Sequence, residues 1–229
     1  MDAKNTTSKL AFLEQFPLFN VLDKADLHTI AEKVEFKVKE RFSYIYLPDE
    51  VSHSIFFLYK GSVKIGTHFN DGREVIKSIL YPSTMFGELG LVGEEKRKDF
   101  AQALNEDVEI YTLRVAEFQK LMERNHRLCL NVINLLGGRL RKAENRLEAL
   151  VFKDARTRII DFLKESVKTR GLRVGYEMLL RHSLTQQDIA NLTGTSRQTV
   201  TSVLNDLRKS DLIYFNRKSI LIRDMANLA

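Results

Sequence analysis

The chain has 229 residues, of which 44% are hydrophobic, and a net charge of +6, a composition that supports one or two ordinary buried cores. No run of about 18 apolar residues could cross a membrane, and the N-terminus lacks the apolar stretch of an export signal. The single cysteine, Cys129, excludes an internal disulfide and a cysteine-ligated iron–sulfur cluster within one chain. These features predict a cytoplasmic protein with no membrane partner.

Residues 1–124 are expected to form the first domain. Residues 8–34 have apolar positions at helical spacing. From about residue 35 the sequence consists of short runs rich in β-branched and aromatic residues. The segment 70–72, Asn-Asp-Gly, is a strong hairpin signal. Many short strands at this spacing predict a small antiparallel barrel or sandwich. The expected strands are 42–47, 54–59, 61–65, 74–80 and 108–113.

A long helix is expected from about residue 125 to 152, followed by a hinge at 152–154, so that residues 125–153 form a second segment. Leucines and an alanine recur along it at steps of four and three residues, which is the spacing of a heptad seam. Gly137 and Gly138 each cost the helix about 1 kcal/mol, a cost that a close approach of two helices would offset. The alternative is a helix packed on its own barrel. The pattern favours a homodimer, with a seam of Leu136, Leu140, Ala143, Leu147 and Leu150.

Residues 154–229 form the third expected piece, which contains two short amphipathic helices joined by a tight turn. Thr185 is placed to cap the first helix, Gly194 to adopt the left-handed conformation of the turn, and Ser196 to cap the second helix. Helix pairs of this kind also occur in all-helical domains that bind no DNA. Here the second helix presents polar groups that suit base edges in the major groove, namely Arg197, Gln198, Thr201 and Ser202.

Two expected strands, 212–215 and 219–222, follow the helix pair and enclose a basic tip at Arg217 and Lys218. Residues 154–229 also hold 13 Lys and Arg against 8 Asp and Glu, whereas residues 1–153 hold 23 against 22. This excess of positive charge is what contact with phosphates requires. The alternative for the tip is a solvated turn. The sequence therefore predicts a winged helix that binds double-stranded DNA through Thr185, Gln186, Ser196, Arg197, Gln198, Thr199, Thr201, Ser202, Arg217 and Lys218.

Three motifs in this order resemble the Crp/Fnr family of bacterial transcription regulators: Gly61–Lys64, Phe86–Leu91 and Ser196–Val200. The resemblance covers nearly the whole chain. It implies an α+β fold with an antiparallel β-roll or jelly-roll sensor domain, a long dimerisation helix and a C-terminal winged helix-turn-helix. It also implies a homodimer on a palindromic operator, an effector that re-aims the winged helices, and RNA polymerase as a partner. No enzyme motif competes, because 87–90 is neither a Walker nor a dinucleotide fingerprint.

The effector is where the chain departs from the family pattern. In members that bind cyclic nucleotides, an Arg followed by Ser or Thr pairs with the phosphate, but Arg97 here is followed by Lys98 and Asp99. Where the catabolite activator contacts adenine, this chain has Ala143 and Glu144. Cyclic AMP is therefore not favoured, and a cyclic-nucleotide-responsive activator and a ligand-independent regulator with a structural barrel both stay open. The histidines show no metal-ligand spacing. The resemblance places the effector pocket at Phe86, Gly87, Glu88, Leu89, Gly90, Arg97, Lys98 and Arg139.

Overall fold

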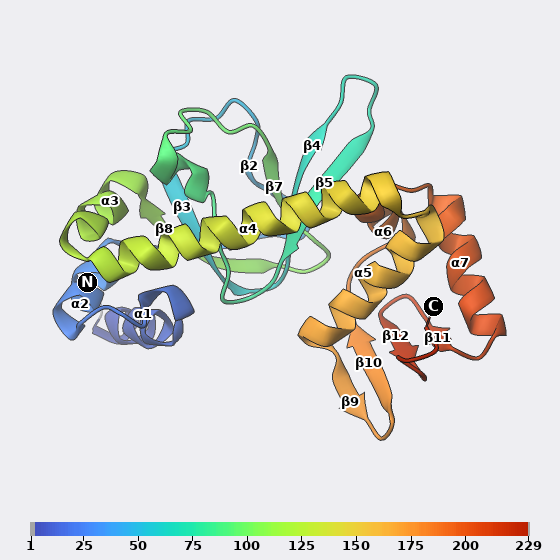
Figure 1. Ribbon diagram of the computed structural model, residues 1–229. Helices are drawn as coiled ribbons and strands as arrows, with labels where there is room; N and C mark the ends of the chain where they lie inside the picture. Colours follow the sequence, from blue (N-terminus) through green and yellow to red (C-terminus); the bar gives the residue numbers. More distant parts are fainter. Residues whose placement is uncertain (1–2, 229) are drawn as a thin grey trace. The chain divides into compact units, whose positions relative to one another are not determined.

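The computed structural model describes residues 3–228, which form two compact units. The first contains residues 3–67 and 77–141, and the second contains residues 68–76 and 142–228. Figure 1 shows the order of the elements along the chain. The strands form two four-stranded sheets in the N-terminal roll and a third four-stranded sheet in the C-terminal part. All the strand pairings recorded between residues 35 and 222 are antiparallel, and the expected α+β class is confirmed. No helix among the described residues is long and apolar enough to span a bilayer.

The N-terminal helical region is divided into three pieces rather than one. Helix α1 spans Ala3–Gln15, a 3₁₀ turn η1 spans Pro17–Phe19, and helix α2 spans Lys24–Lys33. Pro17 starts the 3₁₀ turn because its missing N–H is not needed at the first position of a helix. Asp23 then caps α2 by accepting a hydrogen bond of 2.8 Å from the backbone N–H of Asp26.

The roll is built from two antiparallel sheets, with strand orders β1-β8-β3-β6 and β2-β7-β4-β5. Helix α3, Val115–Arg124, follows the last strand of the roll. The sequence reading did not separate α3 or the first strand from their surroundings, although it found most of the other strands. The bounds are β1 Glu35–Lys39, β2 Tyr44–Tyr46, β3 Ser54–Lys60, β4 Val63–His68, β5 Glu74–Leu80, β6 Met85–Phe86, β7 Phe100–Ala103 and β8 Val108–Arg114.

Two hydrophobic clusters hold the roll together. One lies between the sheets and includes Leu58, Val63 and Ile110. The other joins the sheet of β3 to the N-terminal helices and is rich in aromatic rings, such as Phe57, which makes an edge contact with Phe16 at a centroid distance of 5.2 Å. Each buried aromatic ring removes a large apolar area from water, so these rings contribute strongly to the stability of the first unit.

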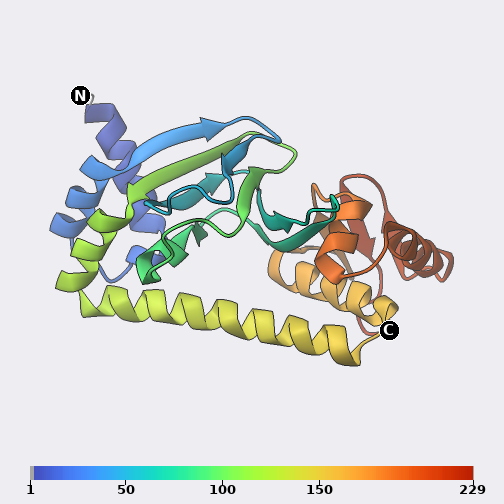
Figure 2. The ribbon, with the colours of Figure 1, turned by 90° about the horizontal axis from the view of Figure 1, so that it is seen from above.

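Helix α4, His126–Phe152, is the longest helix and is drawn end to end in Figure 2. Its first turns are anchored, because Leu128 and Val132 are buried in the aromatic cluster and Leu136 packs against that cluster. Beyond these turns its apolar side chains are exposed, including Leu140 and Leu147. The helix thus changes from a core element into one with an uncovered apolar stripe.

The C-terminal domain places a helix-turn-helix on a small sheet of order β11-β12-β10-β9. The sheet has two more strands than the sequence predicted, β9 at Leu172–Val174 and β10 at Glu177–Arg181, joined by a turn in which Gly175 has a φ of 62°. The first strand has only three residues, and the residues of β10, Glu-Met-Leu-Leu-Arg, do not alternate as in a half-buried strand, so the hairpin has a weak sequence signal. The other elements are α5 Ala155–Arg170, α6 Gln186–Thr193, α7 Arg197–Lys209, β11 Ile213–Phe215 and β12 Ser219–Ile222.

Candidate DNA interface and effector cassette

The two helices of the helix-turn-helix begin at the residues that the sequence indicates. The Thr185 side chain accepts from the backbone N–H of Asp188 at 3.1 Å, and the Asp188 carboxylate accepts from the backbone N–H of Thr185 at 2.8 Å, which completes a capping box. Gly194 has a φ of 62°, and Ser196 caps α7 through the N–H of Thr199 at 3.0 Å. These contacts fix where α7 starts, so Thr185, Ser196 and Thr199 act first as helix caps.

The outer face of α7 carries side chains that are open to solvent. A shallow hollow on it is lined by Arg197, Gln198, Thr201, Ser202 and Asn205. The opposite face is closed, because the apolar side chains of α7, Val200 among them, are buried. An amphipathic helix with one polar face free is what insertion into a major groove needs.

Gln186 lies on α6 yet belongs to the same surface, because its Oε1 lies 2.6 Å from the Thr201 hydroxyl. That hydroxyl also lies 2.9 Å from the Arg197 carbonyl oxygen. With its carbonyl oxygen held, Gln186 retains its NH₂ group as a donor for an acceptor on DNA. The structure therefore brings the first turns of α6 and α7 together into one polar surface.

The wing is the turn between β11 and β12. Asn216 Oδ1 accepts from the backbone N–H groups of Lys218 at 2.8 Å and Ser219 at 2.9 Å, which holds the turn in one shape. Arg217 and Lys218 are exposed at its tip. Their long side chains can reach a phosphate without distorting the turn, as contact with the DNA backbone requires.

The effector cassette follows β6 and consists of a 3₁₀ turn, η2 at Glu88–Val92, between two left-handed glycines, Gly87 at φ 74° and Gly93 at φ 97°. Gly90 has no room for a side chain, because a Cβ there would lie 2.5 Å from the Ser52 carbonyl oxygen. Phe86 is buried beside Phe56, with the rings stacked at 5.0 Å, whereas Leu89 is exposed. The glycine pattern therefore has a packing reason in this chain, separate from any ligand.

Arg97 is 3% exposed and is fully engaged within the protein. Its guanidinium donates to the carbonyl oxygens of Gly87, at 2.9 Å, and of Ser54. The Glu94 carboxylate lies 3.6 Å away, and the Tyr46 ring lies 4.6 Å from the guanidinium carbon. The Arg that family members direct at a phosphate is thus held by two carbonyls, a carboxylate and an aromatic face.

The position after Arg97 also lacks the expected chemistry. Lys98 is exposed, and Asp99 accepts from Lys77 Nζ at 3.1 Å and from the Tyr46 hydroxyl at 3.3 Å. Burial raises the pKa of Tyr46, and the charge of Asp99 raises it further, so the phenol stays protonated. A carboxylate next to the cassette opposes an approaching phosphate.

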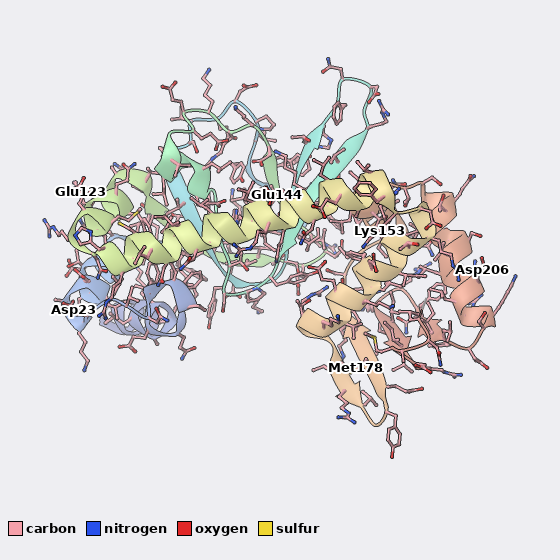
Figure 3. The ribbon with its side chains drawn as sticks, viewed as in Figure 1. Asp23, Glu123, Glu144, Lys153, Met178 and Asp206 are labelled. Carbon is pink, nitrogen blue, oxygen red and sulfur yellow. The ribbon has the colours of Figure 1, made fainter. Side chains whose placement is uncertain are left out.

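Glu88 and Arg139 form an ion pair between the cassette and α4, and Arg139 also donates to the Met85 carbonyl. Burial raises the pKa of Glu88, although Arg139 acts in the opposite direction. The second carboxylate oxygen of Glu88 is buried and meets no donor among residues 3–228. Further along α4, Ala143 and Glu144 are exposed, and Figure 3 labels Glu144 midway along the helix.

The sequence reading missed three residues that hold these sites. Glu94 and Tyr46 enclose Arg97, and Asn205 extends the polar face of α7. Asn205 lies seven residues after Gln198, hence two helical turns along the same face, and that spacing could have identified it. Glu94 and Tyr46 left no signal, because only the fold brings them to Arg97.

Comparisons with known proteins agree with this geometry. Residues 37–125 match the family model of the cyclic nucleotide-binding domain, and residues 157–229 match that of the Crp-like helix-turn-helix domain. A CRP-like cAMP-activated global transcriptional regulator of Mycobacterium tuberculosis is 32% identical over 185 residues, 81% of this chain and 82% of the relative. The cyclic AMP receptor protein of Thermus thermophilus is 27% identical over 212 residues, 93% and 94% of the two chains.

Solved structures share the fold. A CooA mutant from Carboxydothermus hydrogenoformans superposes with a TM-score of 0.74 at 27% identity, covering 86% of this chain and 87% of that one. FixK2 from Bradyrhizobium japonicum superposes with a TM-score of 0.76 at 22% identity, covering 85% and 95% of the two chains.

Proposed function

Because the chain belongs to the Crp/Fnr family of transcription regulators, in which dimers and effector sensing are typical, we propose that it binds a palindromic operator as a homodimer and that one α7 enters the major groove of each half-site. The observation that supports this best is the polar face of α7, whose hollow is lined by Arg197, Gln198, Thr201 and Ser202. Arg suits guanine and Gln suits adenine. Gln186 adds a donor beside them, and Arg217 and Lys218 contact phosphates.

The test is selection of duplexes from a random library by the full-length chain. We expect an enriched palindrome whose half-sites lie about one helical turn apart. Enrichment of no sequence, or of a single non-repeated element, would contradict the proposed dimer on a palindrome. The molar mass of the free chain, measured by light scattering, then shows whether the chain fails to form a dimer or forms a dimer that does not bind a palindrome.

The dimer seam proposed from exposure is shifted from the one that the sequence indicates. Leu136 packs on the core of its own chain, and a Cβ on Gly194 would lie 2.8 Å from Leu150 Cδ2, so both side chains have partners in their own chain. The exposed leucines and isoleucine chosen for the seam are separated by three, seven and seven residues, which is also a heptad spacing. The proposed seam is Leu130, Ile133, Leu140 and Leu147, with Gly137 between the second and third.

Leu140→Glu tests this seam, because the dimer would bury two carboxylates where it now buries two leucines. Sedimentation equilibrium should show the dimer weakened by at least about 3 kcal/mol, the sum of lost apolar burial and an unpaired charge from each copy. Asn145→Glu, on an exposed part of α4 outside the stripe, is the matched control. A dimer as tight as the wild type would refute the seam.

The second part of the proposal is that cyclic AMP does not control this chain. Arg97 has its guanidinium occupied by Gly87, Ser54 and Glu94, and Asp99, where a small residue is expected, is a carboxylate paired with Lys77. A phosphate would have to displace these partners. The Mycobacterium tuberculosis relative is described as cAMP-activated, so the outcome separates this chain from that relative.

Calorimetric titration of the full chain with cyclic AMP and cyclic GMP decides the matter. We expect no binding heat at roughly millimolar ligand at either of two temperatures. Binding at roughly micromolar concentration would overturn the proposal. It would favour the second candidate, a cyclic-nucleotide-responsive activator, in which a ligand hydroxyl donates to the buried free oxygen of Glu88.

RNA polymerase is proposed as a further partner of the DNA-bound dimer. The β9–β10 hairpin carries Tyr176 at its tip, 98% exposed, and Figure 1 draws this hairpin apart from α7. An exposed aromatic ring away from the DNA face suits a protein contact. Tyr176→Ala should reduce transcription in vitro while operator affinity stays unchanged, and equal transcription by the variant and the wild type would exclude this surface.

A further inference from the structure

The C-terminal end of α6 is held by two arginines that come from two different helices. A helix leaves its last carbonyl groups without partners inside the helix. Here the carbonyls of Asn191, Leu192, Thr193 and Gly194 accept side-chain hydrogen bonds, the first two from Arg146 and the last two from Arg158. A positive charge at this end also matches the helix dipole.

Arg146 reaches α6 from the last turns of α4. Its Nη2 lies 3.3 Å from the Asn191 carbonyl oxygen and also donates to the Leu192 carbonyl. Burial lowers the pKa of Arg146, but a guanidinium stays charged in any protein environment. A partly buried cation aimed at a helix C-terminus is a built contact, unlike the solvated lysine one turn before it, Lys142.

Arg158 reaches the same helix end from α5. Its Nε donates to Thr193 O at 2.9 Å, its Nη2 to Gly194 O at 3.0 Å, and its Nη1 to Lys153 O at 2.6 Å. Lys153, labelled in Figure 3, lies in the bend between α4 and α5. Arg158 therefore ties the turn of the helix-turn-helix to the bend.

Together these contacts bridge the bend between α4 and α5. Within the bend, the Asp154 side chain caps α5, and Lys153 forms an ion pair of 2.8 Å with Asp161 that is half-exposed. α6 is in turn joined to α7 through the Gln186–Thr201 contact. Arg146 therefore links α4 directly to α6, and α6 in turn contacts α7, so a change in the direction of α4 can be passed to α7 along this path.

We propose that Arg146 is a positioning residue that couples the long helix to the recognition helix, and that it sets the half-site spacing that the dimer accepts. Arg158 has a different role, because all its partners lie in the bend and in the turn of the helix-turn-helix. Loss of Arg146 removes the hydrogen bonds from α4 to α6 and leaves the caps of the helix-turn-helix in place, whereas loss of Arg158 removes the hydrogen bonds that hold its turn. The spacing part of this inference rests on the proposed dimer, and the coupling part does not.

The coupling is tested by amide hydrogen exchange of the full chain, free in solution. In Arg146→Ala, the N–H of Lys153, which donates to Ala149 O at 3.1 Å, and its neighbours at 151–155 should exchange at least about tenfold faster. The amides of α7 should keep their protection. Unchanged exchange at the bend would overturn the coupling, and equal loss of protection in the bend and α7 would show a merely structural role.

The spacing is tested by fluorescence anisotropy on three duplexes taken from the selected palindrome: the palindrome, one half-site, and the palindrome with one base pair inserted at its centre. Arg146→Ala should lose about tenfold or more on the palindrome, keep half-site affinity within about twofold, and discriminate less against the insertion. Arg158→Ala should lose affinity for all three duplexes. Lys142→Ala, the matched control, should equal the wild type.

If the alanine variant does not fold, Arg146→Lys tests the proposal in its place. A lysine retains one charged donor for the Leu192 carbonyl, so the same pattern should appear with a smaller amplitude. Palindrome affinity unchanged in Arg146→Ala, or an equal loss on palindrome and half-site, would overturn the spacing role. Failure of the wild type to select a palindrome would instead refute the proposed dimer, and the exchange experiment would still decide the coupling.

Discussion

Arg97 and Arg197 are the same side chain in opposite surroundings. Arg97, in the cassette, is buried against an aromatic ring and bonded to two backbone carbonyls, whereas Arg197, on the recognition helix, is exposed at the rim of a polar hollow. A buried cation needs its partners, since an unpaired charge in the interior is costly. The difference teaches that an arginine at a motif position can serve the core, whereas the arginine that we propose reads DNA is exposed.

The largest expected effect is on stability, from Arg97→Ala. Removal of the guanidinium takes the donor from the Gly87 and Ser54 carbonyls and the cation from Glu94, which should lower the free energy of unfolding by about 3–5 kcal/mol. Urea unfolding of the full chain measures it. Arg73→Ala, which removes an exposed pair with Asp71, should cost about 1 kcal/mol or less. Similar losses in the two variants would show that Arg97 is not a structural residue.

The next largest effect is expected on the affinity for operator DNA, from Arg197→Ala. It should cost about 1–3 kcal/mol of specific binding if the side chain reads a base. It should change the free energy of unfolding by no more than about 0.5 kcal/mol, because an exposed side chain is lost. Lys209→Ala, an exposed cation at the other end of α7, should weaken operator and scrambled duplex alike. Unchanged operator affinity of Arg197→Ala would reject its role.

The smallest expected effect is on the pH dependence of the stability, which changes when Glu88 is replaced. Because burial raises the pKa of this carboxyl above its ordinary 4.5, the folded state holds the proton more tightly than the unfolded state. Its contribution to stability is therefore full below pH 4.5 and decreases as the pH rises through the folded pKa. Glu88→Gln removes this titration. The free energy of unfolding of the variant, relative to that of the wild type, should therefore increase with rising pH. A difference independent of pH between 4 and 8 would contradict it.

The sequence predicted the DNA-reading part well because its signals are local. A cap, a left-handed glycine and an apolar stripe each depend on residues within one or two helical turns, and the structure has all three at Thr185, Gly194 and Val200. The β-roll was equally recognisable as a class. The family and the fold class are confirmed by relatives and solved structures.

The cassette was harder to predict because its chemistry is not local. The partners of Arg97 include Ser54 and Tyr46, more than forty residues earlier in the chain, and no spacing rule connects them. The proposed seam had the same difficulty. A heptad pattern identifies apolar positions, but only packing shows that Leu136 serves the core of its own chain. The seam and the site residues remain predictions that the experiments above test.

The contacts of Arg146 and Leu150 determine where a fragment that contains the DNA-binding domain should begin. A fragment that begins at Asp154, after the helical bend, would remove the Arg146 donor from the Asn191 and Leu192 carbonyls and the Leu150 side chain from Gly194. A fragment that begins at Lys142 keeps both side chains and should be the smallest piece that folds with its α6 end protected. The last eleven residues of the long helix, 142–152, therefore belong structurally to the DNA-binding domain. A chimaera that exchanges DNA-binding domains between relatives should be joined at Lys142.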